Sequence, residues 1–341
     1  MTLNNTFRFR NQWIGLAMLW IMWFHSGLSV DITILRYLKR IGYGGVDICL
    51  FASGIGCYFS LEKDPDILRF LKRRIKRLGP TYLCFIIPWL CWRQMEMEMP
   101  WNAVLGNLLG IQTLVSWQYH FNWYIGGLVV FYICLPYLKR LTDFCETPWK
   151  DFLVWVCLAI VGIPFWNDGG NDIVILSRLP ILYAGVVCAK MAKQGKVLTK
   201  MDYLLMLLAT AMGAVSLFAF NRYMPDLLWL CGLHWYPFAL IVPGICIALA
   251  VLMERFQHLN LFRFVNRILE IIGRYSFEVY LTHVFLYEGL MPQIMSRGWN
   301  TSRNMMWLLT LPVVAGGSYL LNRAAAVVNW LLKTKDKRIK A

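Results

Sequence analysis

The chain is short of charged residues, and above all of acidic ones. Of its 341 residues, 16% are Asp, Glu, Lys or Arg, against about 25% in an ordinary soluble domain. Only 19 residues are acidic and 34 are basic, which gives a net charge of +15. These charges lie in short segments between long apolar runs, and 58% of the residues are hydrophobic. This pattern is typical of a polytopic membrane protein.

The sequence also lacks the patterns of two other protein classes. Its ten cysteines include no CxxC pair and no regular spacing, so we expect neither a disulfide framework nor a metal site. The excess of Lys and Arg lies in loops between apolar runs, where membrane orientation explains it. We therefore expect membrane lipids around the chain and no nucleic-acid partner.

Apolar runs of about 20 residues predict about ten membrane spans, and hence an all-α helical bundle that forms a single domain over residues 1–341. The first apolar run is not followed by an A-x-A cleavage pattern, so we expect it to be retained. The segment 104–116 is apolar but short, which favours a re-entrant or interfacial helix. The predicted spans are residues 12–30, 41–60, 78–94, 120–138, 151–166, 173–190, 202–219, 234–253, 268–290 and 304–332.

The loop charges predict the orientation of this bundle. If the N-terminus is cytoplasmic, the basic segments 63–77, 139–150 and 190–196 and the basic C-terminal tail all fall on the cytoplasmic side. This arrangement follows the positive-inside rule and places both termini in the cytoplasm. The segment 31–40, with three basic residues, is the exception.

Several ionisable residues lie inside predicted spans, where they are costly and mark functional sites. With a rise of 1.5 Å per residue, His25 lies roughly 20 Å into a hydrocarbon core of about 30 Å, and His283 about two-thirds of the way across. Asp47, His120 and Arg178 lie near the outer ends of their spans. The polar groups therefore gather in the outer half of the bundle.

Each of these residues has a structural interpretation and a functional one. His120 could be an interfacial anchor, and Asp47 could be a structural partner of Arg178. His25 and His283 lie too deep for a simple interfacial role, and a neutral His can act as a general base near pH 7. Asp47 could orient such a His and stabilise its charged form.

The basic run FLKRRIKRLGP (70–80) also has two interpretations. Orientation signalling and contact with anionic lipids are the simpler one. Alternatively, Arg73, Arg74 and Arg77 hold the phosphates of an intracellular donor, because guanidinium groups pair with phosphates in bidentate fashion. Arg73 and Arg77 are one helical turn apart and would share a face.

Six motifs follow one another between residue 8 and about residue 290. In order and spacing, the set resembles the membrane acyltransferase 3 family, of which many members O-acetylate bacterial surface polysaccharides. The motifs are a first helix ending in His25, GVDICLFASG (45–54), FLKRRIKRLGPTY (70–82), YHFNWYIGGL (119–128), SRLPILYAGV (177–186) and SFEVYLTH (276–283).

The resemblance implies a multi-pass enzyme of the bacterial inner membrane. It would move an acyl group, acetyl from acetyl-CoA, to a hydroxyl of a carbohydrate or lipid-linked glycan, with the acyl-CoA as co-substrate and no bound cofactor. His25 would be the general base or the transient acyl carrier, supported by Asp47. The acceptor side would be lined by His120, Trp123, Arg178, Tyr280 and His283. The donor phosphates would be held by Arg10, Arg73, Arg74 and Arg77.

The sequence departs from the family pattern at one position of the first helix. The family usually carries an arginine eleven positions before the first-helix His, and here that position is Ile14. Arg10, one turn earlier, is the nearest upstream arginine. The donor contact therefore comes from Arg10 or from the cluster 73–77, or the mechanism differs.

Two other functions remain open on the sequence alone. A proton-coupled transporter could use the same intramembrane His and Asp residues, but the chain shows no paired halves with helices broken at matching positions. A catalytically inactive relative that binds lipid or glycan would fit the missing arginine. The sequence specifies no oligomeric state.

Overall fold

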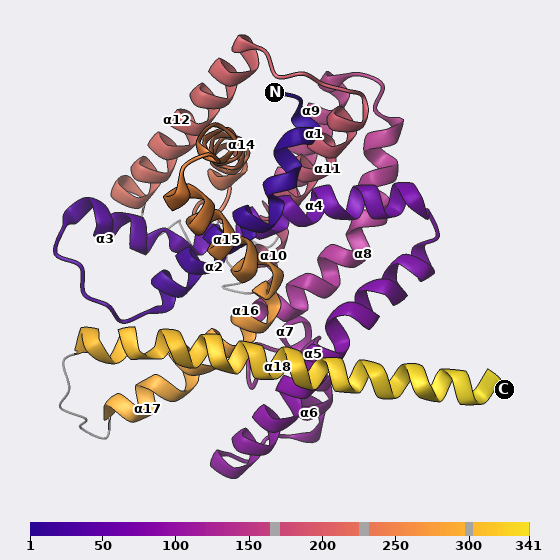
Figure 1. The fold of residues 1–341 in the computed structure, drawn as a ribbon, viewed down its shortest axis with the longest axis vertical. Helices are drawn as coiled ribbons and strands as arrows, with labels where there is room; N and C mark the ends of the chain where they lie inside the picture. The colour runs from indigo at the N-terminus through magenta and orange to yellow at the C-terminus, as the bar shows by residue number, and fades with distance from the viewer. Residues whose placement is uncertain (164–170, 225–231, 297–302, 341) are drawn as a thin grey trace.

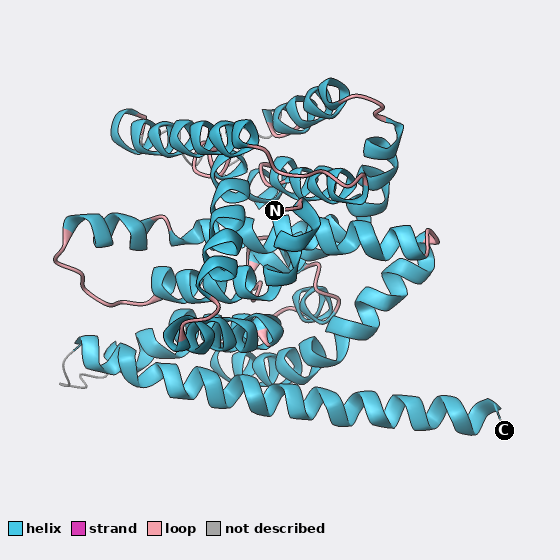
Figure 2. Cartoon of the chain, turned by 45° about the horizontal axis from the view of Figure 1, so that its top comes forward, coloured by secondary structure: helices cyan, strands magenta, loops and turns pink. Residues whose placement is uncertain are grey.

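The computed structural model describes residues 1–163, 171–224, 232–296 and 303–340. In these ranges the chain is helical, apart from loops and one isolated bridge between Thr2 and Val197 (Figure 2). The predicted all-α class is therefore confirmed. Helices α12 and α18 lie on opposite sides of the bundle (Figure 1).

The helices follow one another along the chain with few long connections. The first part contains α1 (Leu3–Thr6), η1 (Phe7–Phe9), α2 (Arg10–His25), α3 (Thr33–Arg40), η2 (Gly42–Gly44), α4 (Gly45–Lys63), α5 (Ile67–Glu96), α6 (Trp101–Leu108), α7 (Gln112–Val115) and α8 (Trp123–Phe144). The second part contains α9 (Pro148–Ile160), α10 (Asn171–Leu176), α11 (Leu179–Lys193), α12 (Lys200–Tyr223), α14 (Phe238–Phe256), α15 (Asn260–Arg274), α16 (Ser276–Val284), the π-helical segment η4 (Phe285–Leu290), α17 (Met291–Ser296) and α18 (Arg303–Lys340).

Six helical segments of the described chain are long and apolar enough to cross a membrane, and each overlaps a predicted span. The other four predicted spans overlap helices that are shorter, more charged or interrupted, and residues 164–166 of the span 151–166 lie outside the described residues. The total of about ten therefore stays a prediction. The segment 104–116 forms parts of two short helices, α6 and α7. The six segments are Gly42–Lys63, Trp123–Phe144, Asp172–Lys193, Lys200–Tyr223, Phe238–Phe256 and Trp307–Leu332.

Two helix pairs pack so closely that glycine is required at their contacts. A Cβ atom on Gly54 of α4 would lie 2.4 Å from a carbonyl oxygen of α11, and one on Gly185 of α11 would lie 2.2 Å from a carbonyl oxygen of α4. Between α2 and α15 the corresponding distances are 2.0 Å at Gly15 and 1.9 Å at Gly273. Small residues of this kind let membrane helices approach each other's backbone. These contacts fix α2 and α4, the helices that carry His25 and Asp47.

Several of the segments predicted to be cytoplasmic lie together at one end of the bundle. The Glu62 carboxylate contacts Lys139 Nζ at 3.2 Å and Lys193 Nζ at 2.6 Å, which joins the ends of α4, α8 and α11. The Leu3 N–H donates a hydrogen bond of 2.9 Å to the Lys196 carbonyl, so the N-terminus lies at the same end. The structure thus agrees with the relative placement of these segments, and their cytoplasmic location stays a prediction.

The basic segment that violates the orientation rule is the helix α3 rather than a loop. The Arg36 guanidinium donates hydrogen bonds to the carbonyl oxygens of Val30 and Asp31, at 2.9 and 3.0 Å. Lys39 Nζ donates to the Leu28 carbonyl at 2.8 Å. These cations hold the preceding turn of the chain, which gives the unexpected positive charge a local structural role.

Most of the basic segment 63–77, expected as a loop, is also helical. Helix α5 begins directly after Asp66, whose side chain caps its first turn by accepting a backbone N–H hydrogen bond. A capping carboxylate at this position stabilises the start of a helix. Arg73, Arg74 and Arg77 therefore project from a rigid helix of 30 residues.

A buried polar network joins α8, α9 and α11. Lys190 Nζ donates to the Asp151 carboxylate at 2.8 Å and to the carbonyl oxygens of Thr142 and Cys145 at 2.7 and 2.6 Å. The other Asp151 oxygen accepts hydrogen bonds from the Thr142 and Tyr183 hydroxyl groups. All three ammonium protons and both carboxylate oxygens are used, which is the condition under which a buried ion pair is tolerated.

Replacing Lys190 by Met should destabilise the fold. The change leaves the Asp151 carboxylate and two carbonyl groups at the end of α8 without their donor, and breaking one half of a buried pair costs about 3–5 kcal/mol. We expect the Tm of the purified protein in detergent to fall by several degrees. Lys193→Met on the same helix is the control, because that side chain is 52% exposed and exposed pairs contribute at most about 1 kcal/mol. Equal Tm values for the two variants would contradict the role of the network.

Candidate active site

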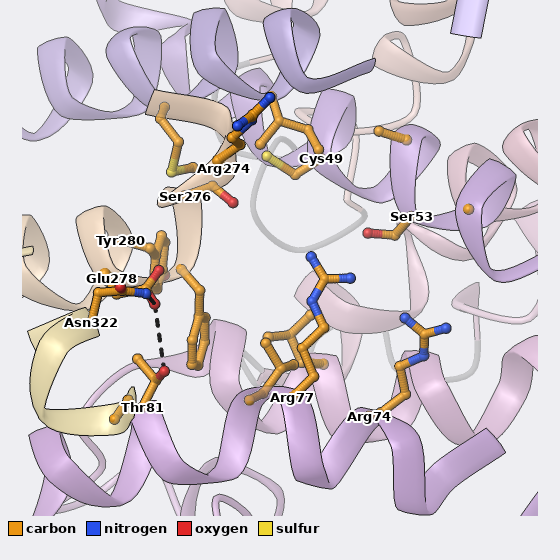
Figure 3. Close-up of a pocket in the computed structure, with 18 of the residues that line it drawn as sticks. Cys49, Ser53, Arg74, Arg77, Thr81, Arg274, Ser276, Glu278, Tyr280 and Asn322 are labelled. Carbon is orange, nitrogen blue, oxygen red and sulfur yellow. Dashed lines mark hydrogen bonds between the residues drawn. The ribbon is translucent and has the colours of Figure 1, made fainter. Parts of the chain in front are cut away.

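A cavity of about 510 Å³ lies between α2, α4, α5, α8, α15, α16 and α18. Its lining contains four arginines, Arg10, Arg74, Arg77 and Arg274, and one carboxylate, Glu278. Arg74 and Arg77 extend from α5 into the cavity (Figure 3). This excess of guanidinium groups suits an anion with several phosphates, because each guanidinium offers a planar pair of donors.

Arg10 reaches the cavity across the surface of α4, and Gly56 makes room for it. A Cβ atom at position 56 would lie 2.1 Å from Arg10 Nη1, so any larger residue would displace the guanidinium. Burial and the nearby charge of Arg77 lower the pKa of Arg10. An anion bound in the cavity would relieve this cost. Ile14, one turn further along α2, lines the same cavity.

Arg73 differs from the other three predicted donor-binding arginines. Its guanidinium pairs with the Asp64 carboxylate, and Arg73 is not among the residues that line the cavity. This hydrogen bond holds the pKa of the Asp64 carboxyl below its usual range. The face of α5 that meets the cavity carries Arg74 and Arg77, three residues apart, rather than Arg73 and Arg77. Both spacings place residues on a common helix face, so the sequence did not distinguish between them.

The cavity leads toward a pair of histidines along two helices. On α2, Met18 lines the cavity, and His25 follows seven residues later, roughly 10 Å further along the axis. On α16, Tyr280 lines the cavity, and its ring centroid lies 5.4 Å from that of His283. The rings of Tyr280 and Tyr124 pack at 4.7 Å. These two tyrosines stand where the cavity ends and the histidine site begins.

The two histidines contact each other through a hydrogen bond whose direction can be worked out. His25 Nδ1 lies 3.1 Å from His283 Nε2, and His283 Nδ1 lies 2.8 Å from the Val279 carbonyl oxygen. A carbonyl only accepts, so His283 carries its proton on Nδ1 and, when neutral, accepts on Nε2. His25 must then carry its proton on Nδ1. Its Nε2 then carries the lone pair, which can act as a base.

The carboxylate beside His25 is Glu288, which the sequence analysis did not select. Glu288 Oε1 lies 3.3 Å from His25 Nε2. The side chain of His25 is 17% exposed and that of Glu288 is 48% exposed, so this end of the site is accessible from outside the protein. Glu288 falls inside the predicted span 268–290, and the test for ionisable residues within spans would have found it.

Asp47 and Arg178 form a buried ion pair with each other. Asp47 Oδ1 lies 3.7 Å from Arg178 Nε, and both side chains are 1% exposed. The Arg178 guanidinium lies between the rings of Trp123 and Trp235, 4.6 and 4.9 Å from their centroids. Buried charges are found in proteins when they are paired with an opposite charge. Of the two interpretations of Asp47, the structure therefore supports the partner of Arg178, and it places no contact between Asp47 and His25 in the described chain.

His120 lies in the loop before α8 and is oriented locally. Its Nδ1 contacts the Trp117 carbonyl, and the two rings pack at 4.6 Å. The buried Asn107 side chain holds the loop by donating to the Tyr119 carbonyl at 2.8 Å and accepting from the Phe121 N–H at 3.0 Å. Tyr119 has a φ of +60°, a strained value for a bulky residue. The hydrogen bond of His120 is thus within its own loop and not to the histidine pair.

Comparison with known proteins gives one match. No curated protein and no solved structure matches the chain. A family model described as an acyltransferase domain matches residues 15–323, a range that contains the histidine pair and all the cavity arginines except Arg10. The six apolar helices agree with the membrane location of such proteins. The chain therefore belongs to the acyltransferase 3 family.

Proposed function

We propose that the protein is an O-acyltransferase of the bacterial inner membrane that moves an acetyl group from acetyl-CoA to a hydroxyl of an exported or cell-surface glycan. The observation that carries the proposal is the cavity itself. It gathers four guanidinium groups and ends at Tyr280, which packs against His283 of the histidine pair. One site for a polyanionic donor and one for base catalysis are thus adjacent.

The arginine end of the cavity suits the phosphates of a coenzyme A thioester. Arg74 Nη2 donates to the Ser60 hydroxyl at 2.9 Å, two residues before Glu62. The arginines therefore lie toward the end of the bundle that is predicted to be cytoplasmic, where acyl-CoA is found. Arg10, Arg74 and Arg77 would hold the donor there, with its thioester directed toward Tyr280.

The histidine end suits the activation of an acceptor hydroxyl. The hydroxyl proton moves to His25 Nε2 while the hydroxyl oxygen attacks the thioester carbon. The new C–O bond forms, the C–S bond breaks, and the departing sulfur takes the proton from Nε2 to give free CoA. His283 holds the His25 ring in the tautomer that this step requires, as the orienting residue of a triad does.

Replacing His25 by Ala should abolish acyl transfer. Loss of a general base lowers the rate by roughly 100- to 10,000-fold. The measurement is glycan acetylation in cells, together with release of free CoA by the purified protein. His258→Ala is the control, because that His is exposed and belongs neither to the cavity lining nor to the histidine pair.

The outcomes of this experiment separate the alternatives. Full acetylation by His25→Ala at normal protein levels would remove His25 from catalysis. Substrate flux into vesicles without acetylation would indicate a transporter. Binding of acetyl-CoA by the unmodified protein without CoA release, over a panel of glycans, would indicate an inactive relative.

Arg77→Ala should weaken the donor site, whereas the neighbouring change Arg73→Ala should not. A hydrogen bond to a charged group contributes about 1.5–3 kcal/mol, so we expect the KM for acetyl-CoA to rise roughly 10- to 100-fold in Arg77→Ala. Arg73 faces Asp64 outside the cavity lining, which makes it a matched control on the same helix. Equal KM values for the two variants would exclude the cavity as the donor site.

Arg10 should serve in place of the arginine that the family usually carries at position 14. Arg10→Ala should raise the KM for acetyl-CoA, and adding Ile14→Arg should restore it, because both side chains line the same cavity one turn apart. Gly56→Ala should reproduce the defect of Arg10→Ala by displacing the guanidinium. A double variant as poor as Arg10→Ala would mean that position 14 cannot supply the donor contact.

A further inference from the structure

Glu288 contacts the side of the His25 ring that faces away from His283. Its carboxylate oxygen faces the only nitrogen of that ring that is not engaged by the histidine pair, at 3.3 Å. The groups that contact the His25 ring in the described chain are His283 from α16, Glu288 from η4 and the preceding Phe24. His283 in turn is packed edge-on by Tyr280 and Tyr287. Among the described residues, Glu288 is therefore the one acidic group in contact with the histidine pair.

The π-helical segment brings Glu288 to this position. Residues five apart in an α-helix are about 140° apart around the axis, so in a regular helix Glu288 would point away from the face of His283. The segment Phe285–Leu290 is instead π-helical, and its wider turn joins residues five apart by hydrogen bonds. Such segments occur frequently at functional sites. Here the local geometry places a carboxylate and His283 on the same side of the chain.

The contact between His25 Nε2 and Glu288 indicates which protonation state of His25 the site favours. The His25 Nε2 lone pair and an ionised carboxylate repel each other unless a proton lies between them. The arrangement is favourable when His25 is an imidazolium, since Nε2–H then donates to Glu288. Nδ1–H still donates to His283. The site is thus complementary to the protonated form of His25, the form that exists after the base has taken a proton.

We propose that Glu288 is a positioning residue for the reaction, acting through His25. The proposal rests on the function proposed above and assigns its acid–base partner. When His25 Nε2 takes the acceptor hydroxyl proton, the Glu288 carboxylate stabilises the imidazolium while the C–O bond forms and the C–S bond breaks. The proton then leaves Nε2 for the departing sulfur, so Glu288 remains ionised throughout and takes no proton itself. Stabilisation of a charge that develops during the reaction lowers the barrier.

The test is the pH dependence of kcat in Glu288→Gln, measured on the purified full chain with acetyl-CoA and a glycan acceptor. We expect kcat to fall roughly 10- to 100-fold. The base works only when unprotonated, so activity rises with pH through the titration of His25. Removing the neighbouring carboxylate disfavours the imidazolium, and the acidic limb of the profile should move to lower pH by about one unit or more. The KM for acetyl-CoA should not change, because the arginine end of the cavity is untouched.

Two further variants complete the experiment. Glu288→Asp keeps the charge and should leave the acidic limb in place with a smaller loss of kcat. Glu96→Gln is the control, because Glu96 bonds to Arg93 and Gln293 and not to the histidine pair. We expect it to match the unmodified protein.

The proposal is overturned if Glu288→Gln keeps the original kcat and profile. It is also overturned if kcat falls with no movement of the acidic limb, since that result indicates a purely structural role. Its failure is distinguishable from failure of the proposed function. An inactive His25→Ala beside a fully active Glu288→Gln would remove only Glu288, whereas an active His25→Ala would remove His25 as well.

Discussion

The close contact between α2 and the α15–α16 segment is the constraint on which the site depends. Gly15 and Gly273 let the backbones touch, with no space for a Cβ atom on either side. Such a contact tolerates no sliding, so it fixes the register between the helix that carries His25 and the one that carries His283. A hydrogen bond of 3.1 Å between two rings 258 residues apart in sequence needs a register of this precision. The contact of Gly15, near the start of α2, with α15 thereby controls geometry at the other end of α2.

The arginines that line the cavity destabilise it electrostatically. Guanidinium groups that share one cavity repel each other, and the burial of Arg10 adds to the cost. The only carboxylate of the lining, Glu278, is already engaged by the Asn322 amide at 3.0 Å. A cavity with this excess of positive charge is therefore less stable than a neutral one would be. A bound polyanion would relieve the repulsion between the guanidinium groups. The free energy regained in this way adds to the affinity for the polyanion, and binding in turn stabilises the folded protein.

The sequence predicted the helical class, because it follows from hydropathy. From the rise per residue it also selected His25 and His283, and the structure places these two rings in contact. It did not separate Arg73 from Arg74, since both lie on plausible faces and only tertiary packing decides which face meets a cavity. It missed Glu288, although this carboxylate lies inside the predicted span 268–290. Its contact with His25 depends on the π-helical segment, which regular helix periodicity does not predict. The sequence likewise left two interpretations of Asp47 open, a partner of Arg178 or a residue that orients a His. The packing shows that Asp47 pairs with Arg178.

The cavity lining around Ile14 differs in polarity from the part that carries Arg10, Arg74 and Arg77. An arginine at that position would carry positive charge to the middle of the cavity, whereas Ile14, Met18 and Leu128 make this part apolar. The part of the lining formed by these three residues is thus uncharged, whereas Arg10, Arg74 and Arg77 supply positive charge elsewhere in the same cavity. A molecule with phosphates at one end and a short acyl thioester at the other matches this division, since each part meets surroundings of its own polarity. The departure of Ile14 from the family pattern is therefore compatible with donor binding, provided that Arg10 supplies the missing cation one turn away.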